Sequence, residues 1–241
     1  MRDLVELYSK KIEKSGILRK FKEKASSVLY GVPSSSHSFA GSALFKSLKN
    51  SQNVIVVSPL NNEAEFLYRE SLSYLEEAES YFFPGPEIIP YEYSGYTSEL
   101  RRDRIRVLSK ILKGERILIF TSVLGFLRSI PDVKSLEKKS FSLKRSVNFS
   151  PEKLIKKLVE LGYKREERCE KFGDFSVKGG IIDLFTSFYD EPLRLDFIGD
   201  TLDEIKIFDP STQRSTGEKN EVTILPCDEF SLNEEEKKKY Y

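Results

Sequence analysis

The residues from Gly31 to Ser38 lie between an expected strand at 27–30 and an expected helix at 38–49, where a phosphate-binding loop would stand. In the pattern GxxxxGK[ST], the glycines let backbone N–H groups approach phosphates, the lysine reaches the terminal phosphates, and the hydroxyl binds magnesium. Gly31 is in register, but Ser36 replaces the second glycine and His37 replaces the lysine. An imidazole is shorter than a lysine side chain and mostly neutral at about pH 7. We therefore expect this degenerate loop to bind no nucleotide, and a serine-capped helix start explains it equally well.

The remaining residue types predict neither a catalytic nor a metal site. Cys169 and Cys227 form no CxxC pattern, and the single histidine, His37, has no second histidine with which to build a metal cluster. The N-terminus lacks the apolar core of a signal peptide, and no apolar run approaches membrane-spanning length. We therefore expect a reducing, cytoplasmic setting, no metal and no contact with a membrane.

The composition favours a protein partner over nucleic acid. Of the 241 residues, 39% are hydrophobic and 32% are charged, and the formal net charge is only +1. Proteins that coat nucleic acid usually carry a clear basic excess. Basic residues are in excess from Lys134 to Arg168, and acidic residues are in excess from Thr186 to Tyr241. This asymmetry suits protein–protein contact, although a solvated surface explains it about as well.

Hydrophobic periodicity predicts two domains. In residues 1–131, helix-like segments alternate with strand-like segments, and the β-branched run Val54–Val57 is typical of a buried parallel strand. We expect a parallel-sheet α/β domain of phosphate-loop type there. Residues 132–226 read as an α+β domain with an antiparallel sheet, in which Ser135–Arg145 alternates like a strand and Ser150-Pro151 begins a helix. Residues 227–241 would begin a return into the first domain.

One strand of the second domain has the composition of a binding surface. Successive side chains of a strand point to opposite faces, so Leu193, Leu195 and Phe197 should share the buried face. Arg194, Asp196 and Ile198 should then share the other face, with Arg194 exposed. An exposed arginine beside an exposed apolar side chain is common in protein-binding hot spots. A surface Arg–Asp pair, with Ile198 covered by a neighbouring helix, is the alternative.

Two other features of this domain have structural explanations. Gly179-Gly180 is expected to permit a bulge or a close approach between strands. Asp183 is expected to form a turn or a salt bridge rather than a catalytic carboxylate pair.

Several segments together resemble UvrB-type DNA-repair proteins. In the first half these are Gly31-Val32, Ile89–Tyr93 and Ile117–Val123. In the second half they are Gly173–Phe185, Pro192–Asp200, Ile205–Ser215 and Ile224–Phe230. UvrB itself has an intact phosphate loop and a long aromatic hairpin after the segment that resembles Tyr91–Tyr93. Here the loop is degenerate and only Ser94–Ser98 precedes the next helix, so the chain is most similar to the N-terminal region of transcription-repair coupling factors.

The resemblance implies a function in nucleotide excision repair at stalled RNA polymerase. In that family the second domain binds UvrA through residues that correspond here to Lys178, Arg194 and Ile198. Only Arg194 is the same residue as in the family. The family has a different basic residue at the position of Lys178 and an aromatic residue at the position of Ile198. The family's RNA polymerase and DNA contacts, and its ATP- and Mg-dependent translocase, lie in domains outside this chain, which we therefore expect to be non-catalytic. A degenerate UvrB paralogue and a nucleotide-dependent α/β enzyme are the alternatives.

Overall fold

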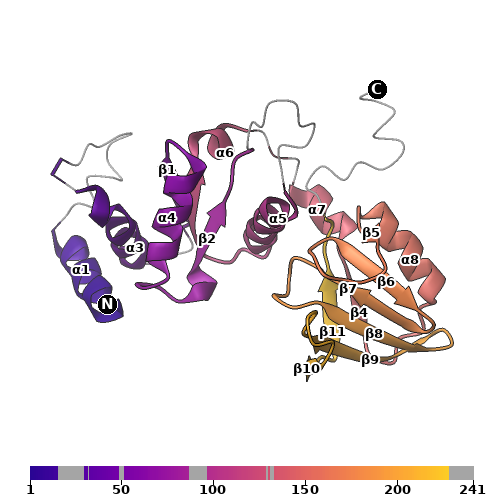
Figure 1. The fold of residues 1–241 in the computed structure, drawn as a ribbon. Coiled ribbons are helices and arrows are strands. Elements are labelled where there is room, and N and C mark those ends of the chain that lie inside the picture. The colour runs from indigo at the N-terminus through magenta and orange to yellow at the C-terminus, as the bar shows by residue number, and fades with distance from the viewer. Residues whose placement is uncertain are drawn as a thin grey trace. The chain divides into compact units, whose positions relative to one another are not determined.

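The computed structural model describes residues 1–15, 30–31, 33–48, 52–86, 97–128, 130 and 133–227. The chain divides into two compact units, and Figure 1 labels most of their helices and strands. The parallel-sheet unit comprises Met1–Gly95 and Lys110–Ser129, and the antiparallel-sheet unit comprises Tyr96–Ser109 and Ile130–Tyr241. The expected strand at 27–30, the segment Tyr91–Tyr93 and the return segment after Cys227 lie outside the described residues.

The parallel-sheet unit contains a three-stranded sheet in the order β1-β3-β2, with every pair parallel. Its elements are α1 (Arg2–Lys14), η1 (Ser34–Ser36), α3 (His37–Ser47), β1 (Val54–Ser58), α4 (Asn61–Ser71), η2 (Glu77–Glu79), β2 (Ser80–Phe83), β3 (Leu118–Ser122) and α6 (Val123–Leu127). Helix α5 (Ser98–Leu112) runs across the division between the units. The mixed α/β fold is confirmed, whereas its assignment to the phosphate-loop type stays a prediction.

The sequence predicts that strand β1 is buried on both faces, and this prediction is wrong. Val54 and Val56 pack against the cluster of Phe45, Leu67, Leu75, Leu118 and Phe120. Ile55 and Val57 point to the other face and are 48% and 42% exposed. Within the described sheet β1 is an edge strand, and a β-branched run has the same composition whether one face or both are covered.

The antiparallel-sheet unit contains a six-stranded sheet in the order β10-β9-β8-β7-β6-β5, in which only the β5–β6 pair is parallel. Its helices are α7 (Val133–Lys139) and α8 (Pro151–Glu160). Its strands are β4 (Phe141–Lys144), β5 (Lys164–Arg165), β6 (Asp174–Lys178), β7 (Ile181–Leu184), β8 (Leu193–Ile198), β9 (Thr201–Phe208), β10 (Ser215–Glu218) and β11 (Glu221–Ile224). Strands β4 and β11 form a separate antiparallel pair.

Two local expectations for this unit have opposite outcomes. The helix start at Ser150-Pro151 is confirmed, because Ser150 Oγ accepts a hydrogen bond from Lys153 N and Pro151 is the first helical residue. The strand expected at Ser135–Arg145 is wrong over its first half, which is helix α7. In a short polar segment, apolar and polar residues can alternate by chance, so the alternation did not identify a strand there. Only the second half of the segment forms a strand, β4.

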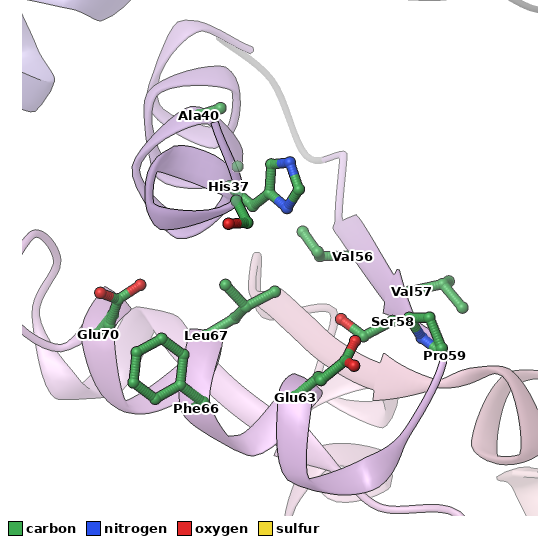
Figure 2. A pocket seen from close by; sticks show the side chains of 12 residues that line it. His37, Ala40, Val56, Val57, Ser58, Pro59, Glu63, Phe66, Leu67 and Glu70 are labelled. Carbon is green, nitrogen blue, oxygen red and sulfur yellow. The ribbon is translucent and has the colours of Figure 1, made fainter. Parts of the chain in front are cut away.

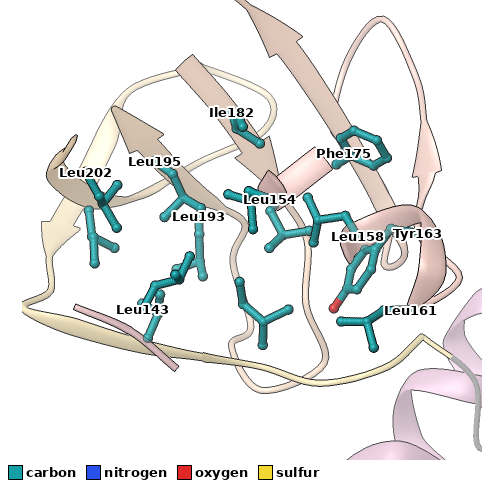
Figure 3. Close-up of a cluster of buried hydrophobic side chains, with 14 of the residues drawn as sticks. Leu143, Leu154, Leu158, Leu161, Tyr163, Phe175, Ile182, Leu193, Leu195 and Leu202 are labelled. Carbon is teal, nitrogen blue, oxygen red and sulfur yellow. The ribbon is translucent and has the colours of Figure 1, made fainter. Parts of the chain in front are cut away.

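The core of this unit lies between α8 and one face of the sheet (Figure 3). Leu154 and Leu158 of α8 are fully buried against Phe175, Ile182 and Leu195 from three neighbouring strands. Complete burial of a leucine stabilises a fold by about 2 kcal/mol, so this contact fixes which face of the sheet is inward. The opposite face of the sheet is the outer face. In the described part of the chain, no helix is long and apolar enough to cross a membrane.

We predict that Gly180→Ala lowers the free energy of unfolding by about 2 kcal/mol, because an added Cβ would lie 2.5 Å from the backbone oxygen of Phe197. Urea denaturation measures this change. Gly217→Ala is the matched control, since a Cβ there has no atom within 4 Å. Equal stability of the two variants would show that the strands separate easily at Gly180.

Candidate functional site

Strand β8 places its side chains as the alternation predicts. Leu193 and Leu195 are fully buried in the core, and Phe197 is 5% exposed. Arg194, Asp196 and Ile198 occupy the alternate positions, where exposure is greater. The second set therefore lies on the outer face of the sheet.

The register of the sheet brings Lys178 to the same face. Lys178 pairs with Ile181, and Ile181 pairs with Asp196, so these three side chains form one row across β6, β7 and β8. In the adjacent row Asp183 pairs with Arg194. The three residues predicted from the resemblance, Lys178, Arg194 and Ile198, thus share the outer face.

Arg194 is held by an ion pair with Asp183, and an Arg–Asp pair is the alternative that the sequence left open. Its Nε donates to Asp183 Oδ1 at 2.7 Å, and its Nη2 donates to Asp183 Oδ2 at 2.8 Å. Nη2 also donates to Gln213 Oε1 at 3.0 Å, and the guanidinium lies 4.4 Å from the ring centroid of Phe208. The hydrogen bonds to Asp183 raise the pKa of Arg194, against the opposing effect of its partial burial. The guanidinium therefore stays charged and has one orientation.

The expectation that Arg194 is exposed was wrong. Its side chain is only 22% exposed, and that of Asp183 is 6% exposed. A planar guanidinium can satisfy a carboxylate with two parallel hydrogen bonds, which draws both side chains down onto the sheet. The expectation of a salt bridge for Asp183 is confirmed. Among the described residues, none accepts a hydrogen bond from Nη1 of Arg194, so its two N–H groups remain available to a partner.

Ile198 is the apolar part of this surface. It is 69% exposed, so the alternative in which a helix covers it is wrong for the described chain. The register of β8 against β9 shifts between Asp196 and Phe197, and Gly199 adopts a φ of +60° immediately after Ile198. This bulge and tight turn end the strand with Ile198 on the surface. Lys178 is also exposed and is the last residue of β6. The close approach between strands that was expected at Gly179-Gly180 is confirmed at Gly180.

Two residues of this site were not predicted from the sequence. Phe208 lies beneath the guanidinium, and Gln213 receives its third hydrogen bond. Pairing of β8 with β9 could have suggested that Phe208 is near Arg194. No pattern indicates Gln213, which lies in a loop with a φ of +60°.

The degenerate loop has a different arrangement. Gly31 adopts a φ of +78°, Ser36 ends the short helix η1, and His37 is the exposed first residue of α3. Ser38 is completely buried, and its Oγ donates to the backbone oxygen of Leu67 in α4 at 2.7 Å. The Ser38 hydroxyl occupies the position that would bind magnesium in an intact loop, and here it links α3 to α4 by a hydrogen bond.

A groove of about 860 Å³ lies beside this loop, between α3 and α4 at the end of β1 (Figure 2). Its polar lining includes His37, Glu63 and Glu70, and none of the described lining residues is lysine or arginine. Across the described ranges, no three His, Cys, Asp or Glu side chains are grouped so that they could hold a metal ion. Cys169 and Cys227 are buried and form no disulfide, and burial raises the pKa of the Cys169 thiol.

Part of the antiparallel-sheet unit is similar to a known class of interaction domain. Residues 141–230 match the family described as the UvrB interaction domain. Over 190 residues, or 79% of its length, the chain is 28% identical to the transcription-repair-coupling factors of Staphylococcus epidermidis and Staphylococcus aureus. The predicted resemblance to the N-terminal region of transcription-repair coupling factors is confirmed. The match covers 16% of the length of these relatives.

We predict that Arg194→Ala destabilises the chain by about 2 kcal/mol, because it leaves the buried carboxylate of Asp183 without its cation. Chemical denaturation measures the loss. Adding Asp183→Ala to Arg194→Ala should recover part of it, since the buried charge is then removed as well. Unchanged stability of Arg194→Ala would show that the ion pair contributes nothing.

Proposed function

We propose that this chain is the N-terminal, UvrB-like region of a transcription-repair coupling factor and that its antiparallel-sheet unit recruits UvrA. The observation that carries the proposal is the match of residues 141–230 to the UvrB interaction domain, since this range contains the whole outer face with Lys178, Arg194 and Ile198. The corresponding positions in the family contact UvrA. The chemistry of these three side chains supports the same role here.

The outer face has the properties of a preorganised binding surface. Arg194 is fixed by Asp183, Gln213 and Phe208 before any partner arrives, so binding restricts few of its rotamers. Its remaining N–H groups can donate to a carboxylate or a carbonyl oxygen of UvrA. Ile198 offers an exposed apolar contact beside this charge. A charged anchor next to an apolar residue is the usual composition of an interaction hot spot.

The absence of catalysis in this chain is part of the proposal. A phosphate loop needs a lysine, a flexible glycine and a hydroxyl directed at the nucleotide. Here His37 and Ser36 replace the first two, and the Ser38 hydroxyl is bonded to Leu67. Glutamates rather than cations line the neighbouring groove, which disfavours phosphate there.

The wider role follows from the family rather than from the described residues. Because the chain spans only 16% of the length of its relatives, the RNA polymerase contact, the DNA contact and the ATP- and Mg-driven translocase are proposed for the whole protein. We propose that the protein acts in the cytoplasm, where transcription and excision repair meet. A degenerate UvrB paralogue would share the UvrA surface, whereas a nucleotide-dependent enzyme would bind nucleotide at the loop.

We predict that Ile198→Asp weakens binding to UvrA about tenfold or more, because it replaces an exposed apolar contact with a charge that must be desolvated. Titration of UvrA with each variant measures the affinity. The fold should be unchanged, since Ile198 is 69% exposed.

Val159→Asp is the matched control for Ile198→Asp. Val159 is an equally apolar residue on α8, 58% exposed and on the other side of the unit. The Val159→Asp variant should bind UvrA with the same affinity as the parent chain. Equal affinities for the parent chain and Ile198→Asp would place the UvrA contact elsewhere.

We also predict that the chain neither binds nor hydrolyses ATP. Isothermal titration with millimolar Mg-ATP should give no saturable heat, because the loop lacks the lysine and the Ser38 hydroxyl is occupied. Saturable binding that His37→Ala abolishes would contradict this expectation and favour the nucleotide-dependent enzyme.

A further inference from the structure

The loop between β9 and β10 holds one residue in a backbone conformation that L-amino acids rarely adopt. Gln213 lies in this loop, residues 209–214, and has a φ of +60°. That value is in the left-handed region, which glycine tolerates and glutamine does not favour. Such a conformation persists only where the surrounding structure holds it, and it is typical of functional sites. The contacts of Gln213 therefore indicate what its conformation serves.

The backbone of this loop is fixed by hydrogen bonds to Asp209. Asp209 Oδ1 accepts from Ser211 N at 2.7 Å and from Thr212 N at 3.0 Å. Asp209 O accepts from Gln213 N at 2.8 Å, and Asp209 N donates to Arg214 O at 3.0 Å. An aspartate whose side chain binds the backbone N–H groups that follow it closes a tight turn. This turn holds Gln213 in its left-handed conformation.

Gln213 is exposed, yet both ends of its side-chain amide are hydrogen-bonded. Its Nε2 donates to Pro210 O at 2.8 Å, and its Oε1 accepts from Arg194 Nη2 at 3.0 Å. A carbonyl oxygen can only accept and a guanidinium can only donate, so these two bonds fix which end of the amide faces Arg194. An exposed glutamine otherwise samples many rotamers. The loop therefore aims one acceptor at the guanidinium.

This acceptor decides which N–H groups of Arg194 a partner can use. A guanidinium has two edges on which paired N–H groups can bind one carboxylate. Asp183 occupies the edge formed by Nε and Nη2. Gln213 takes the second N–H of Nη2, so the edge formed by Nη1 and Nη2 cannot bind a carboxylate through both nitrogens. A partner therefore meets Nη1 alone, which suits a single oxygen atom.

We propose that Gln213 is a positioning residue for the contact with UvrA and that it acts through Arg194; this inference rests on the proposed function. The two bonds to Asp183 lie on one edge of the guanidinium, so the guanidinium could still pivot about that edge. The bond to Gln213 comes from a different part of the chain and stops the pivot. Binding then has less motion of Arg194 to restrict.

Gln213→Gly removes the acceptor without straining the loop, because glycine adopts a positive φ readily. Its affinity for UvrA should be about fivefold weaker than that of the parent chain, with an unchanged circular dichroism spectrum. Gln213→Asn also tolerates this φ, but its amide is one methylene shorter, and it should weaken binding similarly. Ser146→Gly is the matched control: Ser146 is exposed, has a φ of +65° and makes no bond to Arg194, so its replacement should leave the affinity unchanged.

A double-mutant cycle with Arg194→Lys tests whether Gln213 acts through Arg194. A lysine keeps a cation for Asp183 but carries a single ammonium group, so no guanidinium is left for Gln213 to align. In the Arg194→Lys background, Gln213→Gly should therefore leave the affinity for UvrA unchanged. A residue that touched UvrA directly would cause the same loss in both backgrounds.

Two results would overturn this inference and leave the proposed recruitment of UvrA intact. One is parental affinity in both Gln213→Gly and Gln213→Asn, and the other is an equal loss from Gln213→Gly in the parent and Arg194→Lys backgrounds. In either case the parent chain still binds UvrA. A parent chain that does not bind UvrA at all would instead overturn the proposed function, and the positioning role with it.

Discussion

The ion pair between Arg194 and Asp183 is the interaction on which the outer face of the antiparallel sheet depends. Asp183 is a carboxylate with a 6% exposed side chain on a strand whose neighbours are mostly apolar, and it is tolerable there only because Arg194 pairs with it. The pair in turn fixes the guanidinium between Phe208 and Gln213. One electrostatic requirement therefore both satisfies a buried charge and orients the proposed contact for UvrA. Stability and the proposed recruitment of UvrA are therefore coupled at this residue, so a substitution of Arg194 alone tests both together.

Ile198 owes its exposure to the backbone rather than to electrostatics. The close approach of Gly180 to Phe197 and the bulge in β9 opposite Asp196 and Phe197 allow β8 to end abruptly at the turn that begins with Gly199. The apolar side chain is thereby presented without any cost in core packing. A substitution of Ile198 consequently tests the proposed binding to UvrA without disturbing the fold, which a substitution of Arg194 cannot do.

The sequence predicts much of this arrangement, and physical reasons account for the rest. The alternation of Leu193 to Ile198 assigns each side chain to a face, because the period of a strand is fixed by its geometry. The burial of Arg194 depended on which residue stands opposite on β7, and strand register is a long-range property that alternation does not specify. The same limit applies to Ser38, whose partner Leu67 lies on another helix. Helix α7 was missed because a short charged segment carries little periodic information.

Side-chain footprinting with hydroxyl radicals, with and without UvrA, tests the central claim most directly because it needs no substitution. Ile198 and Val159 are both exposed aliphatic side chains of the antiparallel-sheet unit, at 69% and 58%, so both should oxidise in the unbound chain. If the outer face recruits UvrA, addition of UvrA should suppress oxidation of Ile198 and leave that of Val159 unchanged. Undiminished oxidation of Ile198 in a UvrA-saturated sample, or protection of Val159 instead, would contradict the account.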